Sequence, residues 1–126
     1  MIQVKPIQKV NPLDLTAERK YYAHAVATGT VDLERLAFLI ANQSTVREAD
    51  CYAVTLSLVH NMIDALEQGN IVKLDKLGSF QIGVNSTGVS TEKDLTANAI
   101  KKAHVNFRPD AGLRKMLKNL KFKVSS

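Results

Sequence analysis

Thiol, imidazole and carboxyl side chains are the groups of this chain that could perform catalysis or bind a metal. Cys51 and His60 stand nine residues apart on one predicted helix, whereas two metal ligands on a helix need a spacing of about three or four residues. Cys51 is therefore interpreted as a buried core thiol. Asp64 and Glu67 lie one helical turn apart, a spacing typical of a solvated helical face.

The remaining candidates for chemistry are isolated in the sequence. His24 and His104 have no neighbouring ligands, no Gly-rich phosphate loop follows a strand, and no nucleophile motif is present. Tyr21 and Tyr22 could stack on bases, but alternation along a strand turns one of them inward, which favours packing. We therefore expect no enzymatic activity, no metal, no cofactor and no small-molecule substrate.

Basic side chains are the second chemistry-bearing group, and they are unevenly distributed. Residues 30–69 carry 2 basic and 6 acidic groups, whereas residues 70–126 carry 11 basic and 4 acidic groups. This asymmetry predicts a surface that binds a polyanion, either nucleic acid or an anionic membrane. A basic surface that is only solvated is the simpler alternative.

Composition limits the class of protein. A chain of 126 residues with 45% hydrophobic and 23% charged residues is typical of one soluble domain with its own core. No apolar run approaches the roughly 18 residues that cross a bilayer, and the first residues lack the apolar segment of a signal peptide. A single cysteine excludes an internal disulfide. We expect a cytoplasmic protein with no membrane partner.

Two helices are predicted in the acidic middle of the chain. The first begins after an N-cap at Thr30 and ends near Asn42. The second begins with a capping box formed by Thr45 and Glu48 and stops at Gly69. Its apolar residues point to most sides of the helix, so a second subunit is the economical way to surround it. The residues predicted to form this dimer core are Val54, Leu58, Met62, Leu66 and Phe80.

The rest of the chain predicts strands and one more helix. Residues 71–84 read as β structure with a break at Lys76-Leu77-Gly78, and residues 103–107 read as a second strand. Residues 92–102 predict either a short helix or an irregular arm. A last helix opens at Pro109 and Asp110, and its basic flank includes Lys121.

A separate β segment precedes the helices. "IQVKPIQKV" and "KYYAHAV" both favour strands, with a break at Asn11-Pro12. The predicted organisation is an N-terminal β extension over residues 1–28 and one domain over residues 29–126.

The order helix, helix, strand, loop, strand, basic helix resembles the bacterial histone-like (HU/IHF-type) DNA-binding proteins. The resemblance rests on residues 30–80, which look like the helical half and first saddle strand, and on "NFRPDAGLRKMLK", residues 106–118. Leu77-Gly78-Ser79-Phe80 stands where the family has an aromatic-Gly-Thr-Phe step. The resemblance implies an α+β fold of two N-terminal helices, a curved sheet (the saddle) and a C-terminal basic helix, in an intertwined homodimer.

Gly78 has two interpretations on this basis. A glycine within a strand marks a bulge or a close approach of another backbone, so Gly78 would let the strand bend where the saddle turns. Alternatively, Gly78 only ends a short hairpin strand.

The departures from the family are concentrated in the arm. The family's β-arms carry an Arg-Asn-Pro tip whose proline wedges between base steps and kinks DNA. The corresponding stretch here, residues 85–102, contains neither proline nor arginine and includes Glu92 and Asp94. At the start of the last helix, Asp110 and Ala111 replace the family's glycine and basic residue. Strong bending is therefore not expected, and the N-terminal extension places the chain in a variant branch.

The resemblance and the basic second half together predict sequence-tolerant binding of double-stranded DNA in the nucleoid. Basic groups would contact the phosphates, because such contacts position a protein without reading sequence. The candidate DNA-binding residues are Lys73, Lys76, Lys93, Lys101, Lys102, Arg108, Arg114, Lys115, Lys118 and Lys121. The alternative is a histone-like fold used as a structural or protein-interaction module, with the N-terminal strands pairing to a partner by strand addition.

Overall fold

The protein is described by a computed structural model over residues 1–125, which form two compact units. One unit contains Met1–Asp32 together with the chain from Met116 onward, and the other contains Leu33–Lys115. The boundary between them falls inside the last helix. Residues far apart in the sequence therefore share the first unit, while the second unit is continuous.

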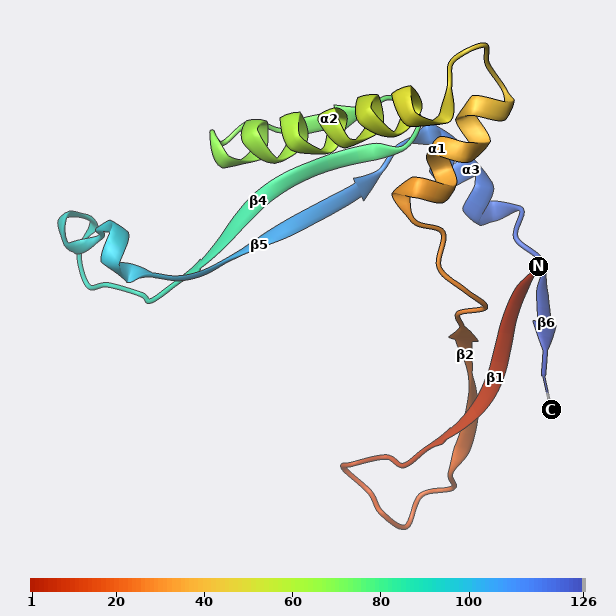
Figure 1. The fold of residues 1–126 in the computed structure, drawn as a ribbon. Coiled ribbons are helices and arrows are strands. Elements are labelled where there is room, and N and C mark those ends of the chain that lie inside the picture. Colours follow the sequence, from red (N-terminus) through yellow and green to blue (C-terminus); the bar gives the residue numbers. More distant parts are fainter. Residues whose placement is uncertain (126) are drawn as a thin grey trace. The chain divides into compact units, whose positions relative to one another are not determined.

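Two helices open the second unit (Figure 1). Helix α1 spans Leu33–Asn42 and helix α2 spans Glu48–Glu67. They pack on each other with Ala37 and Cys51 buried, so the interpretation of Cys51 as a buried thiol is confirmed. The stop predicted at Gly69 is also confirmed, because Gly69 follows the C-cap residue Gln68 and adopts a left-handed φ of 87°.

The predicted starts of both helices are wrong. Helix α1 begins at Leu33 and not directly after Thr30. The capping box is absent because residues 43–46 form a turn, in which the Ser44 hydroxyl accepts the Val46 N–H at 3.2 Å. Arg47 is the N-cap of α2 and makes no side-chain cap, so Glu48 is the first helical residue rather than the third.

The sheet of the second unit has the order β3-β4-β5, with both neighbouring pairs antiparallel. Its strands are β3 (Val72–Leu74), β4 (Gly78–Ser86) and β5 (Ile100–Pro109). Strands β4 and β5 extend together as a long two-stranded ribbon, whose outer loop contains the 3₁₀ turns η1 (Glu92–Asp94) and η2 (Ala97–Ala99) (Figure 1). The strand predicted at 103–107 is present and longer at both ends.

The prediction of continuous β structure over residues 71–84 needs correction. A turn at residues 75–77 divides the segment into the hairpin strands β3 and β4. Lys76 occupies the left-handed region with φ of 75°, which reverses the chain. Leu77 is out of phase with Phe80 and Ile82 because it lies in this turn.

Gly78 begins β4 at a point of close approach. A Cβ on Gly78 would lie 2.5 Å from the Arg108 carbonyl oxygen and 2.6 Å from the Phe107 ring. Close approach of the neighbouring strand is therefore confirmed, but Gly78 lies at the border of the short hairpin, as the second interpretation states, and the register shows no bulge there.

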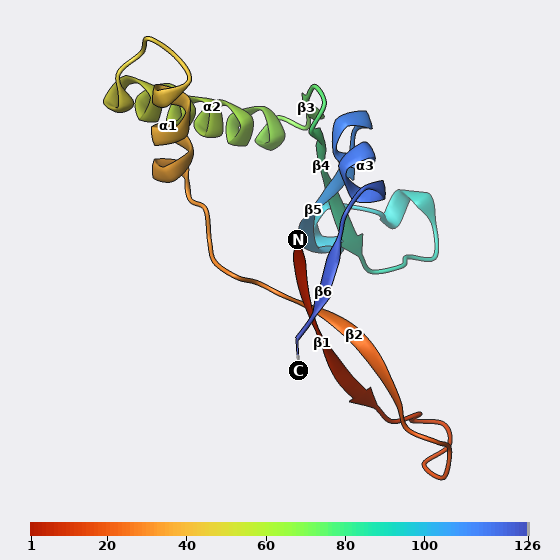
Figure 2. The ribbon, with the colours of Figure 1, turned by 90° about the vertical axis from the view of Figure 1, so that its right-hand side faces the viewer.

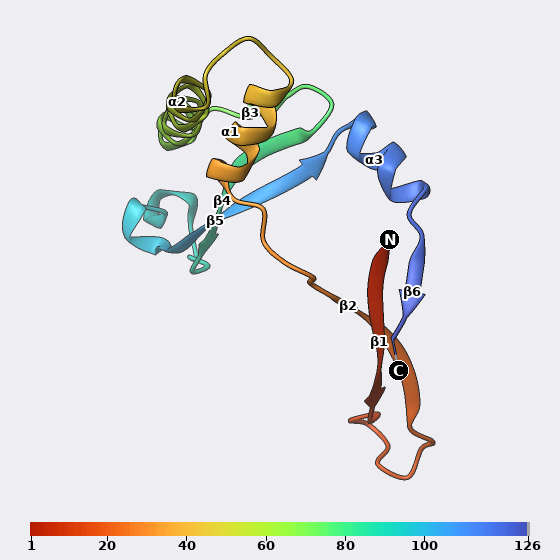
Figure 3. The same ribbon diagram turned by 45° about the vertical axis from the view of Figure 1, so that its right-hand side comes forward.

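The first unit is built around a three-stranded sheet with the order β2-β1-β6 (Figures 2 and 3). Strand β1 (Ile2–Lys9) pairs antiparallel with β2 (Lys20–Val26) and parallel with β6 (Phe122–Val124). Strands β1 and β2 confirm the sequence prediction, whereas β6 was not predicted. Helix α3 (Ala111–Lys118) precedes β6 and ends before Lys121, so the predicted basic flank of this helix is shorter than expected.

Candidate nucleic-acid interface

The register of β4 and β5 sorts their side chains onto two faces, because residues directly opposite each other in a sheet project to the same side. Polar and basic residues occupy one face, which we call the ribbon polar face. Its members are Ser79, Gln81, Gly83, Asn85, Lys102, His104, Asn106 and Arg108. The other face, the ribbon apolar face, carries Phe80, Ile82, Val84, Ala103, Val105 and Phe107.

Three of the predicted DNA-binding residues fall on the ribbon polar face or continue it. Lys73 of β3 is opposite Ser79, and Ser79 is opposite Arg108, so these residues form one row across the three strands. Lys102 lies on the same face six residues before Arg108. Strands β3, β4 and β5 contain no carboxylate. Lys73 forms an exposed ion pair of 4.0 Å with Asp75 of the adjoining turn, so its charge is partly compensated, whereas Lys102 and Arg108 have no carboxylate within the sheet.

Neighbouring side chains fill the space above Gly83 at the centre of the ribbon polar face. A Cβ at this position would lie 2.5 Å from the His104 imidazole and 2.8 Å from the Asn106 amide, so both side chains occupy the space over the glycine. A pocket closer to the helices is lined by Ile71, Ser79, Gln81, Asn106, Phe107 and Arg108. Hydroxyl, amide and guanidinium donors at such a surface suit phosphate oxygens.

Sequence reasoning missed the uncharged polar members of this face. Ser79, Gln81, His104 and Asn106 carry no charge signal, and they were not singled out as binding residues. Their alternation with Phe80, Ile82, Val105 and Phe107 is visible in the sequence. Only the register between the two strands places them all on one side.

The ribbon apolar face is packed within the ribbon but remains open outward. The Phe80 and Phe107 rings lie 4.9 Å apart at 50°, a tilted arrangement that aromatic pairs favour. Val84 and Val105 nevertheless remain 53% and 57% exposed. This face therefore needs a further covering surface.

The other predicted DNA-binding residues lie outside the ribbon polar face. Lys93 stands in η1 between two acidic residues, Glu92 and Asp94. Lys101 is the extra residue of a β-bulge, since Asn85 pairs with Lys102 and Ser86 pairs with Ile100. Lys118 and Lys121 belong to the first unit.

Lys76, Arg114 and Lys115 lie at a junction between the hairpin turn and α3. The Asp110 carboxylate accepts the Lys76 N–H at 3.1 Å, and the Lys76 carbonyl accepts the Leu113 N–H at 3.1 Å. Backbone N–H groups of Ala111 and Lys76 lower the pKa of the Asp110 carboxyl, and the charges of Lys73 and Arg114 act in the same direction. The ionised carboxylate thus joins the start of α3 to the turn.

The predicted dimer-core residues are incompletely covered within one chain. Val54 and Leu58 are 67% and 46% exposed, and Met62, Leu66 and Phe80 are half-buried. Over residues 33–115, the only buried hydrophobic residues are Ala37 and Cys51. Helix α2 therefore presents apolar side chains that the chain itself does not cover.

Within residues 1–125, no group of three or more His, Cys, Asp or Glu side chains is placed to hold a metal ion. None of the described helices combines the length and the apolar character needed to cross a membrane.

Comparison with known proteins gives a family and two informative structures. Over residues 2–124 the chain matches the HU-HIG family, described as an HU domain fused to a wHTH, Ig or glycine-rich motif. No curated protein matches the chain.

The crystal structure of a proposed bacterial DNA-binding protein from Bacteroides vulgatus ATCC 8482 is similar, with 17% identity and a TM-score of 0.65. The match covers 98% of this chain and 47% of that one, so this chain spans about half the length of that protein. An HU–DNA cocrystal structure from Anabaena is similar with 18% identity and a TM-score of 0.56, covering 71% of this chain and 100% of that one. These likenesses confirm the predicted HU-like α+β fold.

Proposed function

The chain belongs to the HU-HIG family of HU domains fused to a wHTH, Ig or glycine-rich motif, and from this premise we propose that it binds double-stranded DNA through the backbone phosphates. The two similar structures support this ligand, since one is a proposed DNA-binding protein and the other an HU–DNA complex. The binding form is a homodimer associated with the bacterial nucleoid in the cytoplasm. No enzymatic step is part of this function.

The amphipathic β4–β5 ribbon is the observation that carries the proposal. One side offers basic groups and neutral hydrogen-bond donors in strands without a carboxylate. Such donors bind phosphate oxygens, which every DNA sequence presents in the same chemical form. Binding is therefore expected to vary little between sequences. Lys73, Lys102 and Arg108 are the proposed principal contacts.

The remaining predicted basic residues are further phosphate contacts in the proposal. Lys93 and Lys101 would contact phosphates from the outer part of the ribbon, and Lys76, Arg114 and Lys115 from the junction with α3. Lys118 and Lys121 belong to the first unit and would contact phosphates independently of the ribbon.

The uncovered apolar residues support a homodimer. Fully burying one Val, Leu or Ile side chain contributes about 1.5–3 kcal/mol. Val54, Leu58 and Ile63 on α2 are each about half exposed or more. A second copy that covers α2 and the ribbon apolar face would gain part of this free energy at every such residue. The proposed dimer core is the predicted set, Val54, Leu58, Met62, Leu66 and Phe80.

The composition of the outer loop supports weak bending. Architectural proteins kink DNA by inserting apolar wedges such as proline or leucine between base steps. Residues 85–102 contain no proline, and the loop includes the charged turn of Glu92 and Asp94. The ribbon is thus suited to lie along the backbone rather than to unstack bases.

A fluorescence-anisotropy titration with two unrelated duplexes at 50 and 200 mM salt tests the proposal. Three basic groups on the polar face of each chain give six phosphate contacts in a dimer. A plot of log affinity against log salt concentration should therefore have a slope of about −5 from the ribbon, so affinity falls about a thousandfold between these two salt concentrations. Replacing Lys102 and Arg108 with glutamine should reduce the slope by about 3.6, since each change removes two contacts per dimer. Arg47→Gln, at the start of α2, is the charge-matched control and should leave the slope unchanged.

Absence of duplex binding at low salt by a folded dimer would overturn DNA binding. It would favour the protein-interaction module, for which β2 offers a seven-residue edge strand in the first sheet.

A further inference from the structure

The sheet of the first unit is also two-faced, and its register assigns every charged residue of its strands to one side. Lys5 is opposite His24, Lys9 is opposite Lys20, and β6 aligns Lys123 with Gln3 of β1. We call this side the lysine face. Its members are Gln3, Lys5, Ile7, Lys9, Lys20, Tyr22, His24, Val26 and Lys123.

The opposite side of the same sheet is free of charge. It carries Ile2, Val4, Pro6, Gln8, Tyr21, Ala23, Ala25, Phe122 and Val124. Val4 at its centre is 7% exposed. The distribution of residues thus gives the sheet one side suited to packing and another suited to solvent or to an anionic ligand.

Most of the net charge of the protein lies in this unit. Its 43 positions, Met1–Asp32 and Met116–Ser126, carry seven basic and three acidic side chains, a net charge of +4. The 83 positions of Leu33–Lys115 carry ten basic and nine acidic side chains, a net charge of +1. The smaller unit is therefore the more strongly cationic of the two.

The lysines of this face are available for an external anion. Within residues 1–125, none of Lys5, Lys9, Lys20 and Lys123 forms an ion pair. Lys9 lies over the Tyr22 ring, with Nζ 5.4 Å from the ring centroid, which orients its charge without neutralising it.

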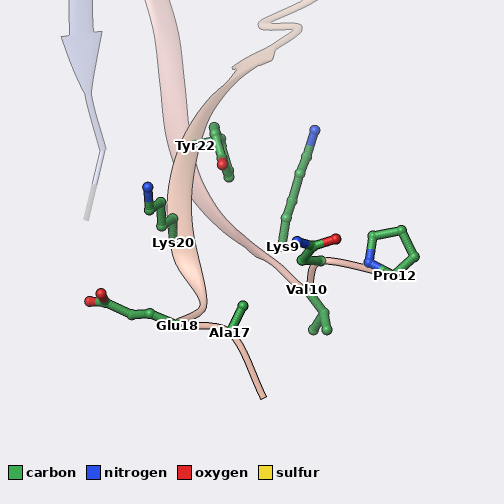
Figure 4. Close-up of a pocket in the computed structure, with 8 residues that line it drawn as sticks. Lys9, Val10, Pro12, Ala17, Glu18, Lys20 and Tyr22 are labelled. Atoms are coloured by element: carbon green, nitrogen blue, oxygen red, sulfur yellow. The ribbon is translucent and has the colours of Figure 1, made fainter. Parts of the chain in front are cut away.

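Two of these lysines line a pocket at the end of the β1–β2 hairpin. Lys9, Lys20 and Tyr22 line it with loop residues that include Glu18 (Figure 4). The carboxylate of Glu18 points away from the Lys9 ammonium (Figure 4). The other loop carboxylate, Asp14, is engaged by the Thr16 hydroxyl at 2.6 Å and by the Thr16 N–H.

We propose that the lysine face of the β2-β1-β6 sheet is a second contact surface for the phosphate backbone of duplex DNA, separate from the β4–β5 ribbon. This inference rests on the proposed function and names a further surface for the same ligand. Lys5 and Lys9 are four residues apart on β1, roughly 13 Å at strand rise, which is comparable with the major-groove width of about 12 Å. Long lysine stems at the two ends can therefore reach phosphates on both sides of a groove.

Charge complementarity favours DNA over a protein partner. Lysine is depleted in protein–protein interfaces, whose centres are apolar and poor in charge. A face on which all the strand charges are lysines, with no carboxylate, instead matches a continuous polyanion.

The test compares the intact chain with a variant in which Lys5, Lys9, Lys20 and Lys123 are all changed to glutamine. Loss of four phosphate contacts should reduce the salt slope of duplex binding by about 3.6 per engaged sheet. Between 50 and 200 mM salt, the factor by which affinity falls should accordingly be about 150 times smaller for the variant than for the wild type. The corresponding four-arginine variant retains the charge and should retain the slope.

Two further measurements keep the outcomes distinct. Arg19→Gln removes one charge beside Lys20 but outside the strands, and should change the slope less than Lys20→Gln does. Circular dichroism must show that each variant is folded. If the wild type binds DNA and the four-glutamine variant keeps its slope, the lysine face is refuted while the proposed function stands. If the folded wild type does not bind duplex DNA, both are refuted.

Discussion

Replacement of Gly78 by alanine should destabilise the protein because the added Cβ has no space. It would lie 2.5 Å from the Arg108 carbonyl oxygen and 2.6 Å from two atoms of the Phe107 ring. The carbonyl belongs to the ladder of β4 and β5 and cannot rotate aside, so the strands must separate locally. Overpacking of this kind typically costs about 1–3 kcal/mol. For a chain of this size the melting temperature should fall by roughly 4 °C for each kcal/mol.

Two other glycines provide matched comparisons for this change. Gly88, in the outer loop of the ribbon, has nothing within 4 Å of an added Cβ, so Gly88→Ala should change stability by no more than about 1 kcal/mol. Gly83→Ala meets only the side-chain ends of His104 and Asn106, which can move, so its effect should be intermediate. Urea unfolding followed by circular dichroism, at one protein concentration for all variants, measures the order. Equal stability of the Gly78 and Gly88 variants would refute the close packing of β4 against β5.

Three further outcomes follow from the structure and the proposed function. Because folding lowers the pKa of Asp110, the ionised carboxylate stabilises the protein above the ordinary carboxyl pKa, and this stabilisation is lost as the pH falls through the lowered pKa. Asp110→Asn should therefore reduce the loss of stability at acidic pH, measured by urea unfolding at several pH values. An unchanged dependence of stability on pH would contradict this role of Asp110. Leu58→Asp should abolish dimerisation and cooperative folding. If light scattering showed that the folded protein of native sequence is a monomer at micromolar concentration, the dimer would be excluded. Bending of a duplex, measured by fluorescence transfer between its ends, should be weak, and a large bend would show that the loop over residues 87–99 acts as a wedge without proline.

The strands of the first unit show what the sequence could predict. The alternation of Ile2–Lys9 and Lys20–Val26 identified β1 and β2, because local pattern and propensity agree there. Strand β6 has three residues and pairs with β1 from the opposite end of the chain. Neither its length nor its partner leaves a local signal, so the assignment of Lys123 to the lysine face required the structure.

The start of α2 was mispredicted for a local reason. Thr45 and Glu48 have the spacing of a capping box. In the structure, however, the hydroxyl that accepts a backbone N–H belongs to Ser44, the residue before Thr45, and the N–H is that of Val46, within the turn over residues 43–46. Competing caps of similar energy lie within three residues of each other, and the sequence does not rank them.

The candidate interface was predictable in its charges and not in its geometry. Lys73, Lys102 and Arg108 were identifiable as basic residues of the second half of the chain. Their common face depends on the β4–β5 register, in which a slip of one residue would exchange the two faces. The turn at Lys76, with its positive φ, also determines which residues of β3 oppose β4.

Protection of a single engineered thiol by DNA tests the central claim most directly. Gln81 lies on the ribbon polar face and is exposed, and the natural thiol of Cys51 is buried. Gln81→Cys should react with a thiol reagent rapidly in the free protein and much more slowly when duplex DNA is bound. His60→Cys, on the exposed surface of α2, should react at the same rate in both conditions. Equal reactivity of the Gln81→Cys thiol with and without saturating duplex would contradict binding through this face.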